Sequence, residues 1–116
     1  MADERVLAGI PVADHDAATA WYTQFFGRDA DLAPMPGLAE WHCTPLGGVQ
    51  IFHDPEHAGG ATLTLGVPDL NGYLAALRGR GIAVGAVTSG AISRFAPVTD
   101  PEGNTMMIAE LYDKPA

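Results

Sequence analysis

The stretch Asp100-Pro101-Glu102-Gly103-Asn104 lies near the C-terminal end of the chain and has the composition of a hairpin turn. Pro presets φ at about −65° at the second turn position, the preceding Asp can bond the turn backbone, and Gly tolerates the exit. Runs with the composition of β-strands flank this turn, over residues 93–99 and 105–111. We therefore predict a strand pair at the end of the chain, and the rest of the fold can be worked out from this pair.

A similar turn, Pro45-Leu46-Gly47-Gly48, lies 55 residues upstream, so that Gly48 corresponds to Gly103. The same separation relates Val12-Ala13-Asp14 to Val67-Pro68-Asp69, and both Asp residues are placed to cap a following helix. A constant separation between two independent pairs of motifs indicates an internal repeat, against the alternative of a chance similarity between two βα units.

A strand, a helix and three further strands are predicted in each half of the chain. The first half has a strand over 6–12, a helix over 15–26, a short strand or loop over 28–37, and strands over 38–44 and 49–53. The second half has a strand over 61–67, a helix that follows Asp69 and ends at Gly81, a short strand over 82–87, and the strands at 93–99 and 105–111. This order predicts an α+β fold in a single domain over 1–116. Two tandem βαβββ modules, at about 5–53 and 61–111, are joined by a linker over 54–60.

One helix covers only one face of a four-stranded sheet, so each module keeps an uncovered face. We expect the uncovered faces of the two modules to turn inward and form a cupped, barrel-like groove. In the second module Leu63, Leu65 and Val67 have to face the helix, so Thr62 and Thr64 face the groove. Alternation and the repeat together predict a lining of Leu7, Gln50, Phe52, Thr62, Thr64, Phe95, Thr105 and Met107. An apolar lining with a few hydroxyl and amide groups is typical of a site for a small, partly apolar molecule.

The composition favours a globular protein without a nucleic-acid or membrane partner. The formal net charge is −8, and the six Lys and Arg residues are scattered, whereas nucleic acid and anionic membranes require clustered basic residues. No apolar run approaches the roughly 18 residues of a membrane span. Residues 1–5 are acidic and lack the apolar core of a signal peptide. The single Cys43 allows no internal disulfide, which fits a reducing compartment, so we predict a cytoplasmic protein.

The segment Glu40-Trp41-His42 is an unusual local cluster. Trp41 is either a groove residue that stacks on a planar ligand or a core residue, because the pattern of its strand does not fix which face looks inward. Cys43 is predicted to be a small buried thiol, because the neighbouring His42 projects to the opposite side of the strand and cannot activate it. The four His residues are predicted at surface or edge positions; they are His15, His42, His53 and His57.

The motifs that define the repeat also carry a family resemblance. They are Ile10-Pro11-Val12-Ala13-Asp14, Ala20-Trp21-Tyr22, Phe26-Gly27, Gly66-Val67-Pro68-Asp69 and Asp100-Pro101-Glu102-Gly103-Asn104. In this order and spacing the chain resembles the vicinal oxygen chelate superfamily, which includes glyoxalase I, bleomycin-resistance proteins and type I extradiol dioxygenases. The resemblance covers about residues 5–111 and implies the paired βαβββ fold. It is much less informative about activity, because a fold does not imply a function.

The resemblance also implies four positions at which metal-dependent members place His, Gln or Glu on the concave face. One lies on the first strand of each module and one on the last, and the last of them falls four residues after the turn glycine, at Met107. The repeat then gives Leu7, Phe52, Thr62 and Met107, none of which is a ligand for a hard or borderline divalent ion. A shift of one residue brings in only His53. We therefore predict that the protein binds no metal and no other cofactor. Without a metal the usual Lewis-acid mechanism of the superfamily is not expected. Whether the protein is an enzyme is left open.

The leading hypothesis is a metal-free protein that binds or sequesters a small, partly apolar or aromatic molecule, similar to the bleomycin-resistance proteins. The resemblance implies a homodimer. One alternative is a metal-dependent lyase or oxygenase of the glyoxalase or dioxygenase type with displaced ligands. Another is an accessory or structural module with a vestigial groove. No catalytic residue is assigned.

Overall fold

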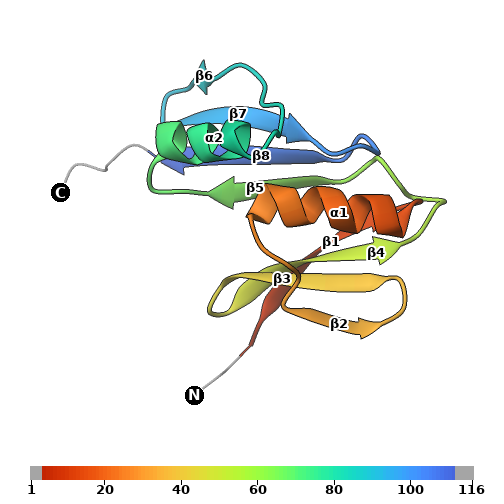
Figure 1. Ribbon diagram of the computed structural model, residues 1–116. Helices are drawn as coiled ribbons and strands as arrows, with labels where there is room; N and C mark the ends of the chain where they lie inside the picture. The colour runs from red at the N-terminus through yellow and green to blue at the C-terminus, as the bar shows by residue number, and fades with distance from the viewer. Residues whose placement is uncertain (1–3, 112–116) are drawn as a thin grey trace.

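The computed structural model describes residues 4–111, and within this range the chain forms two helices and two four-stranded sheets (Figure 1). The elements of the first module are β1 (Val6–Val12), α1 (His15–Phe26), β2 (Leu32–Met35), β3 (Leu38–Thr44) and β4 (Gly47–His53). Those of the second module are β5 (Thr62–Gly66), α2 (Leu70–Gly79), β6 (Thr88–Ser89), β7 (Ser93–Thr99) and β8 (Thr105–Leu111).

The two sheets have the same topology, which confirms the internal repeat and the tandem βαβββ fold. Sheet A has the strand order β1-β4-β3-β2, and sheet B has the order β5-β8-β7-β6. In each sheet the first and last strands of the module pair in parallel, and the remaining pairs are antiparallel. β1 and β5 are therefore edge strands, and Pro11 lies on such an edge as expected, because it lacks a backbone donor.

The helix N-caps predicted at Asp14 and Asp69 are confirmed. The Asp14 and Asp69 side chains accept hydrogen bonds from the backbone N–H groups of Ala17 and Gly72, at 3.0 Å and 3.1 Å. Gly27 ends α1 in the left-handed conformation, with φ of 73°. α2 ends at Gly79, slightly earlier than predicted. These caps fix where each helix begins over its sheet.

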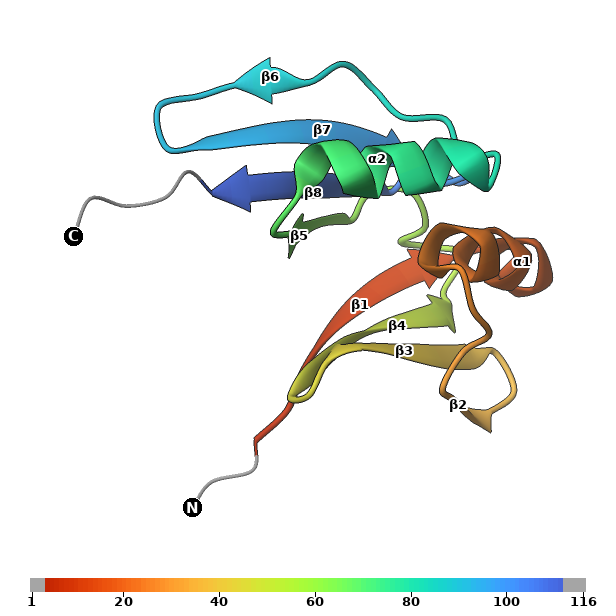
Figure 2. The same ribbon diagram turned by 60° about the vertical axis from the view of Figure 1, so that its left-hand side comes forward.

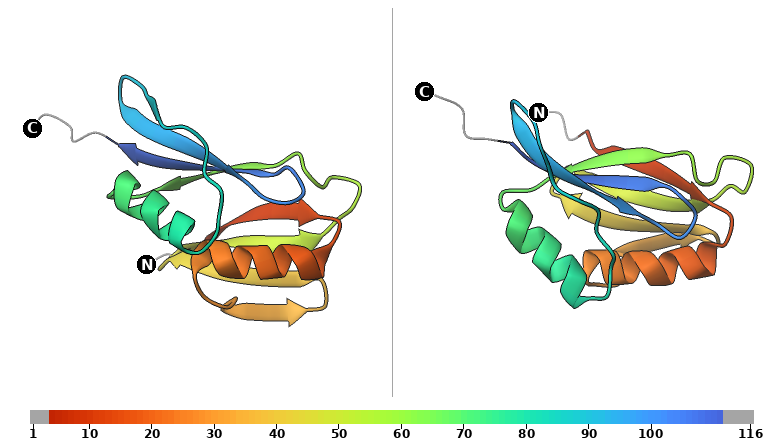
Figure 3. Two further views of the ribbon diagram at one scale, coloured as in Figure 1. Left: turned by 45° about the horizontal axis from the view of Figure 1, so that its top comes forward. Right: turned by 90° about the horizontal axis from the view of Figure 1, so that it is seen from above.

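Both helices lie on the same side of the two sheets, so the molecule has one layer of helices and one layer of strands (Figures 2 and 3). Its dimensions, 46 × 40 × 25 Å, describe a flattened shape. The sheets do not close on one another, and their uncovered faces lie on the side away from the helices. The predicted paired-module fold is therefore present, and the expected groove between its uncovered faces is not closed within one chain.

A single hydrophobic core lies between the two layers and spans both modules. Its largest buried aromatic residues are Tyr22, Phe25 and Trp41. The buried aliphatic residues of the sheets alternate with residues of the uncovered faces, as the period of a strand requires. They include Ile10, Val12, Val49, Ile51, Ala96, Val98, Met106 and Ile108.

Two details of the repeat differ from the sequence prediction. The β3–β4 turn has two residues between its strands, whereas the β7–β8 turn has five. Gln50 therefore pairs with Gly9 while Met107 pairs with Thr64, so the structural counterpart of Met107 in the first module is Gln50 and not Phe52. The strand predicted over 82–87 is absent from the described residues, and the short β6 follows at Thr88–Ser89.

Candidate functional site

The uncovered face of sheet A is built from residues that alternate with the core. Leu7 and Gly9 on β1, and Gln50 and Phe52 on β4, alternate with residues packed under α1. The strand register arranges this face in cross-strand rows. One row contains Gly9, Gln50 and Glu40, and the next contains Pro11, Phe52 and Leu38.

Glycines make room for the apolar side chains of this face. A Cβ atom at Gly9 would lie 3.0 Å from Cε1 of Phe52, so the Phe52 ring occupies the space over β1 that a side chain would fill. A Cβ atom at Gly48 would lie 3.2 Å from Cδ2 of Leu7 and 2.5 Å from the Trp41 carbonyl oxygen. The Leu7 and Phe52 side chains therefore lie against the strands and form an apolar platform.

Three polar side chains border this platform. Glu40 is largely buried, and its Oε1 accepts a 2.7 Å hydrogen bond from Nε2 of Gln50. Its Oε2 lies 3.0 Å from Nε2 of His42, which donates in the matching tautomer. The bonds from His42 and then Gln50 hold the pKa of the Glu40 carboxyl below its ordinary value. Sequence reasoning singled out the Glu40-Trp41-His42 segment but did not place Glu40 on this face, because the orientation of β3 was left open.

The uncovered face of sheet B carries hydroxyl and apolar groups. Thr62 pairs with Thr105, and Thr64 pairs with Met107, so these four side chains form two adjacent rows. Phe95 alternates with the buried Ala96 and therefore points to the same face. The structure thus divides the predicted lining between two sheets: Leu7, Gln50 and Phe52 on sheet A, and Thr62, Thr64, Phe95, Thr105 and Met107 on sheet B.

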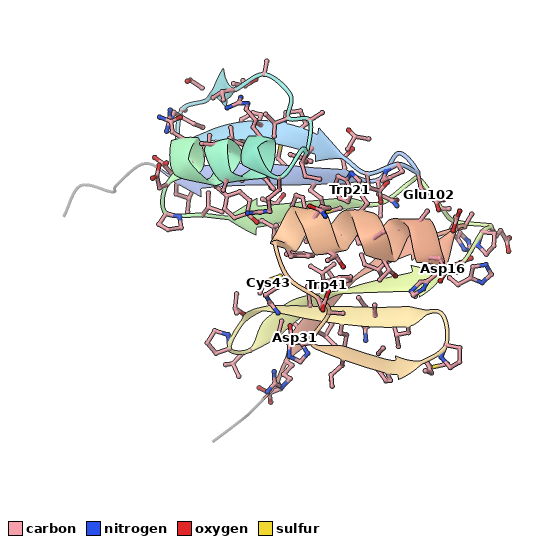
Figure 4. All side chains as sticks on the ribbon, in the orientation of Figure 1. Asp16, Trp21, Asp31, Trp41, Cys43 and Glu102 are labelled. Atoms are coloured by element: carbon pink, nitrogen blue, oxygen red, sulfur yellow. The ribbon has the colours of Figure 1, made fainter. Side chains whose placement is uncertain are left out.

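Trp41 does not belong to the uncovered face, so the interpretation of Trp41 as a groove residue that stacks on a planar ligand was wrong. Its side chain is buried on the helix side and stacks on Phe26 at a centroid distance of 5.4 Å. Its Nε1 donates a 3.0 Å hydrogen bond to the Arg28 carbonyl oxygen. Figure 4 labels Trp41 on the sheet next to α1. The alternative interpretation, that Trp41 is a core residue, is the one that the structure supports.

Cys43 and three of the four His residues lie at exposed or half-buried positions. Cys43 is an exposed residue, so the predicted buried position was wrong, although partial burial of its sulfur raises the pKa of the thiol. His15 is half-buried, with Nε2 at 3.0 Å from the Ile51 carbonyl oxygen. His57 is exposed and bonds Asp54, and His53 ends β4 at an exposed position.

The metal-ligand positions implied by the resemblance do not carry a ligand set. Replacing Phe52 by Gln50, as the strand pairing requires, gives Leu7, Gln50, Thr62 and Met107. A single amide oxygen among these residues does not suit a divalent ion. Between residues 4 and 111 no group of three or more His, Cys, Asp or Glu side chains is arranged to hold a metal. The residues present therefore do not fit the metal of the superfamily, and we derive no chemistry through one.

Two pockets open at the junction between the two modules. Their volumes are about 360 Å³ and about 320 Å³, and they share Cys43, Thr44 and Leu65. The larger pocket also includes Phe26 and Tyr73 from the helices. Of the predicted groove lining, these pockets include only Thr64, so they are hollows of the module junction and not the predicted groove.

The turn that decides the fold joins the two modules. Glu102 accepts hydrogen bonds from the backbone N–H groups of Ala13 and Asp14, at 2.7–2.9 Å, and Figure 4 labels it near the start of α1. Nδ2 of the buried Asn104 donates to the Pro11 carbonyl oxygen at 3.0 Å. The polar side chains of this turn therefore have a structural role, and the turn is not part of the candidate site.

Comparison with solved structures identifies the class of protein. A glyoxalase/bleomycin resistance protein from Catenulispora acidiphila is 31% identical, with a TM-score of 0.88, over 94% of this chain and 99% of the other. An antibiotic binding protein from a Streptomyces species is 26% identical, with a TM-score of 0.78, over 97% and 99%. A lactoylglutathione lyase from Agrobacterium tumefaciens, 19% identical with a TM-score of 0.74 over 90% and 91%, shares the fold alone.

Paired βαβββ modules with open, uncovered sheet faces define the vicinal oxygen chelate class. Within it, this chain belongs to the glyoxalase/bleomycin resistance protein family. No protein-family model matches the chain, and no curated protein matches its sequence. No helix within residues 4–111 has the length and apolar character that crossing a membrane requires.

Proposed function

We propose that this protein binds and sequesters a small, partly apolar or aromatic molecule on the uncovered faces of its two sheets. The observation that carries the proposal is the apolar platform of Leu7 and Phe52, which lies over glycine positions and is bordered by Glu40, His42 and Gln50. An apolar surface with a few oriented polar groups is the usual composition of a small-molecule site.

The relatives support binding as the activity. The Streptomyces relative is described as an antibiotic binding protein, and it aligns with nearly the whole of this chain. The lyase has the same fold, so the fold by itself favours neither reading. The positions implied for the metal hold Leu7, Gln50, Thr62 and Met107, and this lack of a ligand set supports binding over metal-dependent turnover.

We further propose that the binding groove is completed by a second copy of the chain. In one chain both uncovered faces lie on the side away from the helices, so a ligand on one face remains open to solvent. In a homodimer, sheet A of one copy can face sheet B of the other, which combines the apolar platform with the hydroxyl-rich face. The family resemblance implies a homodimer, and such a pairing of sheets would enclose the ligand between the two copies.

The net charge of −8 with six basic residues supports a protein without a nucleic-acid or membrane partner. The single cysteine supports a cytoplasmic location.

The experiment is a thermal-shift screen of planar, partly apolar antibiotics against wild type, Phe52→Ala and the control Ile92→Ala. Ile92 is 71% exposed in the loop before β7, so its removal shortens an apolar side chain away from the face. A ligand should raise the melting temperature of wild type and of Ile92→Ala by mass action, and the shift should be lost in Phe52→Ala. Sedimentation equilibrium should give a dimer. A screen without any stabilising compound would favour a vestigial groove, and equal shifts in all three proteins would place the site elsewhere.

A further inference from the structure

Among the described strands, Glu40 carries the one carboxylate that lies on an uncovered face. In the strands of residues 4–111, the other side chains that alternate onto these faces are apolar, hydroxyl, amide or imidazole groups. We propose that Glu40 recognises a cationic nitrogen donor of the ligand, a protonated amine, amidine or guanidine that lies beside a planar apolar group. The proposal rests on the proposed function and adds the chemical class of the ligand.

The Glu40 carboxylate keeps acceptor capacity. Each of its oxygens takes one side-chain hydrogen bond, from Gln50 at 2.7 Å and from His42 at 3.0 Å. A carboxylate has about four acceptor positions, so about two remain for a ligand. The side chain is 11% exposed, which leaves it in contact with the space over the sheet. The two neighbours also fix its orientation, so little further ordering is needed when a donor binds.

No permanent cation of the described chain pairs with Glu40. Arg28 pairs with Asp31 at 2.7 Å, and Arg94 pairs with Glu110 at 3.3 Å. The Arg80 guanidinium donates to backbone carbonyl oxygens at the end of α1. Within residues 4–111 the only basic side chain at ion-pair distance from Glu40 is His42. The Arg5 guanidinium donates to the Pro45 carbonyl oxygen at 3.2 Å, and its charge acts on Glu40 without an ion pair between them. A positively charged ligand would therefore be the first permanent cation to pair directly with Glu40, and hydrogen bonds between charged groups are about twice as strong as neutral ones.

The apolar part of such a ligand has a place beside the carboxylate. Glu40 lies opposite Gln50 in the register, and Phe52 is two residues further along the same strand and face. Diagonal neighbours of this kind are roughly 7–8 Å apart. A molecule whose cationic nitrogen lies one or two bonds from an aromatic ring can therefore contact both Glu40 and the ring of Phe52, with a cation–π contribution from Phe52.

The test compares two probes of the same shape, naphthylmethylamine and naphthylmethanol, by ligand-observed NMR titration of the full-length protein at neutral pH. Wild type should bind the cationic amine about tenfold more tightly than the alcohol, as a charge-assisted bond requires. In Glu40→Gln this ratio should fall to about one, while the affinity for the alcohol stays the same. The control Glu56→Gln removes one charge from an exposed position of the linker and should keep the ratio. Phe52→Ala should weaken the binding of both probes.

The outcomes separate this inference from the proposed function. If the alcohol binds through Phe52 but wild type shows no preference for the amine, or if Glu40→Gln keeps the preference, the inference is overturned and the proposed function stands. Binding of neither probe to wild type overturns both. If Glu40→Gln does not fold, Glu40→Asp takes its place. Glu40→Asp keeps the charge but shortens the side chain by one methylene, so the preference for the amine over the alcohol should fall. An unchanged preference would overturn the proposed role of Glu40.

Discussion

Tyr22 and Asp100 join the two modules through a buried hydrogen bond of 2.7 Å from the tyrosine hydroxyl to Oδ2 of the carboxylate. Burial and then this bond raise the pKa of Tyr22 far above its ordinary value. Oδ2 of Asp100 also accepts from Nδ2 of Asn104 at 2.9 Å, and Oδ1 accepts from the backbone N–H groups of Glu102 and Asn104. The carboxylate thereby orders its own turn and fixes this turn against α1.

Replacing Tyr22 by Phe should destabilise the protein by about 1.5–3 kcal/mol, the usual effect of losing a hydrogen bond to a charged group. The ring packing survives, but the buried oxygen of Asp100 loses one of its two side-chain donors. Urea denaturation of wild type and variant measures the change. The control is Tyr73→Phe, because the Tyr73 hydroxyl has no hydrogen-bond partner within residues 4–111, and it should stay within about 0.5 kcal/mol of wild type. Equal destabilisation of the two variants would contradict the role of the Tyr22–Asp100 bond.

Glu102 binds the backbone just before α1 of the other module, so Glu102→Ala should destabilise the protein by about 1 kcal/mol. Its carboxylate accepts from the N–H groups of Ala13 and Asp14, at the positive end of the α1 dipole. Glu102→Gln keeps one acceptor oxygen and should lose less. Glu56→Ala, on the exposed linker, is the matched control for the loss of a carboxylate. Denaturation midpoints that are the same for Glu102→Ala and Glu56→Ala would show that the bonds from Ala13 and Asp14 to Glu102 contribute nothing to stability.

The elements that follow from local chemistry could be predicted from the sequence. Asp14 and Asp69 cap their helices because the bond they make lies within one turn of the chain. The β7–β8 strands on either side of the Asp100–Asn104 turn begin and end where the alternation of apolar residues indicates. The repeat of these local signals was sufficient for the fold class.

Contacts between distant residues could not be predicted in the same way. The apolar and polar residues of β3 do not alternate clearly, and only the packing of Trp41 against Phe26 decides that Glu40 points to the uncovered face. The β3–β4 and β7–β8 turns have similar composition but differ in length. For this reason the residue of the first module that corresponds to Met107 is Gln50, whereas the sequence predicted Phe52. The packing of both helices on one side, which leaves the sheets open, is likewise a property of the whole chain.

Stability should fall in acid, and Asp31 should contribute to this fall. The hydrogen bond and charge of Arg28, with the bond from the His42 backbone, hold the pKa of Asp31 below its ordinary value, and the pKa of Glu40 is lowered in the same direction. The unfolded chain then binds more protons than the folded one between the two pKa values, so stability rises with pH in that window. The contribution is fully present above the ordinary carboxyl range of about pH 4 and is lost as the pH falls through the folded values.

Urea denaturation at about pH 3 to pH 7 measures how stability depends on pH, because this range includes the ordinary carboxyl pKa of about 4. Asp31→Asn should reduce the slope of the unfolding free energy below about pH 4, because the substituted side chain no longer titrates. Glu56→Gln serves as the control, since its carboxyl lies in the exposed linker. A slope that is the same in Asp31→Asn and wild type would show that the Arg28–Asp31 pair does not contribute to the acid sensitivity.

Metal should neither copurify in stoichiometric amount nor be needed for ligand binding. The positions that the superfamily resemblance implies hold Leu7, Gln50, Thr62 and Met107, which offer one amide oxygen and one thioether. Elemental analysis of protein purified without chelator should therefore find far less than one metal ion per chain, and added Zn²⁺ or Mn²⁺ should leave the melting temperature unchanged. Treatment with a chelator should not alter the thermal shift caused by a bound antibiotic.

Stoichiometric Zn, Ni, Mn or Fe would instead support a metal-dependent enzyme with displaced ligands. A loss of that metal in His42→Ala but not in His57→Ala would then locate it at the Glu40–His42–Gln50 cluster, the one place on the uncovered faces where imidazole, carboxylate and amide groups meet within the described chain.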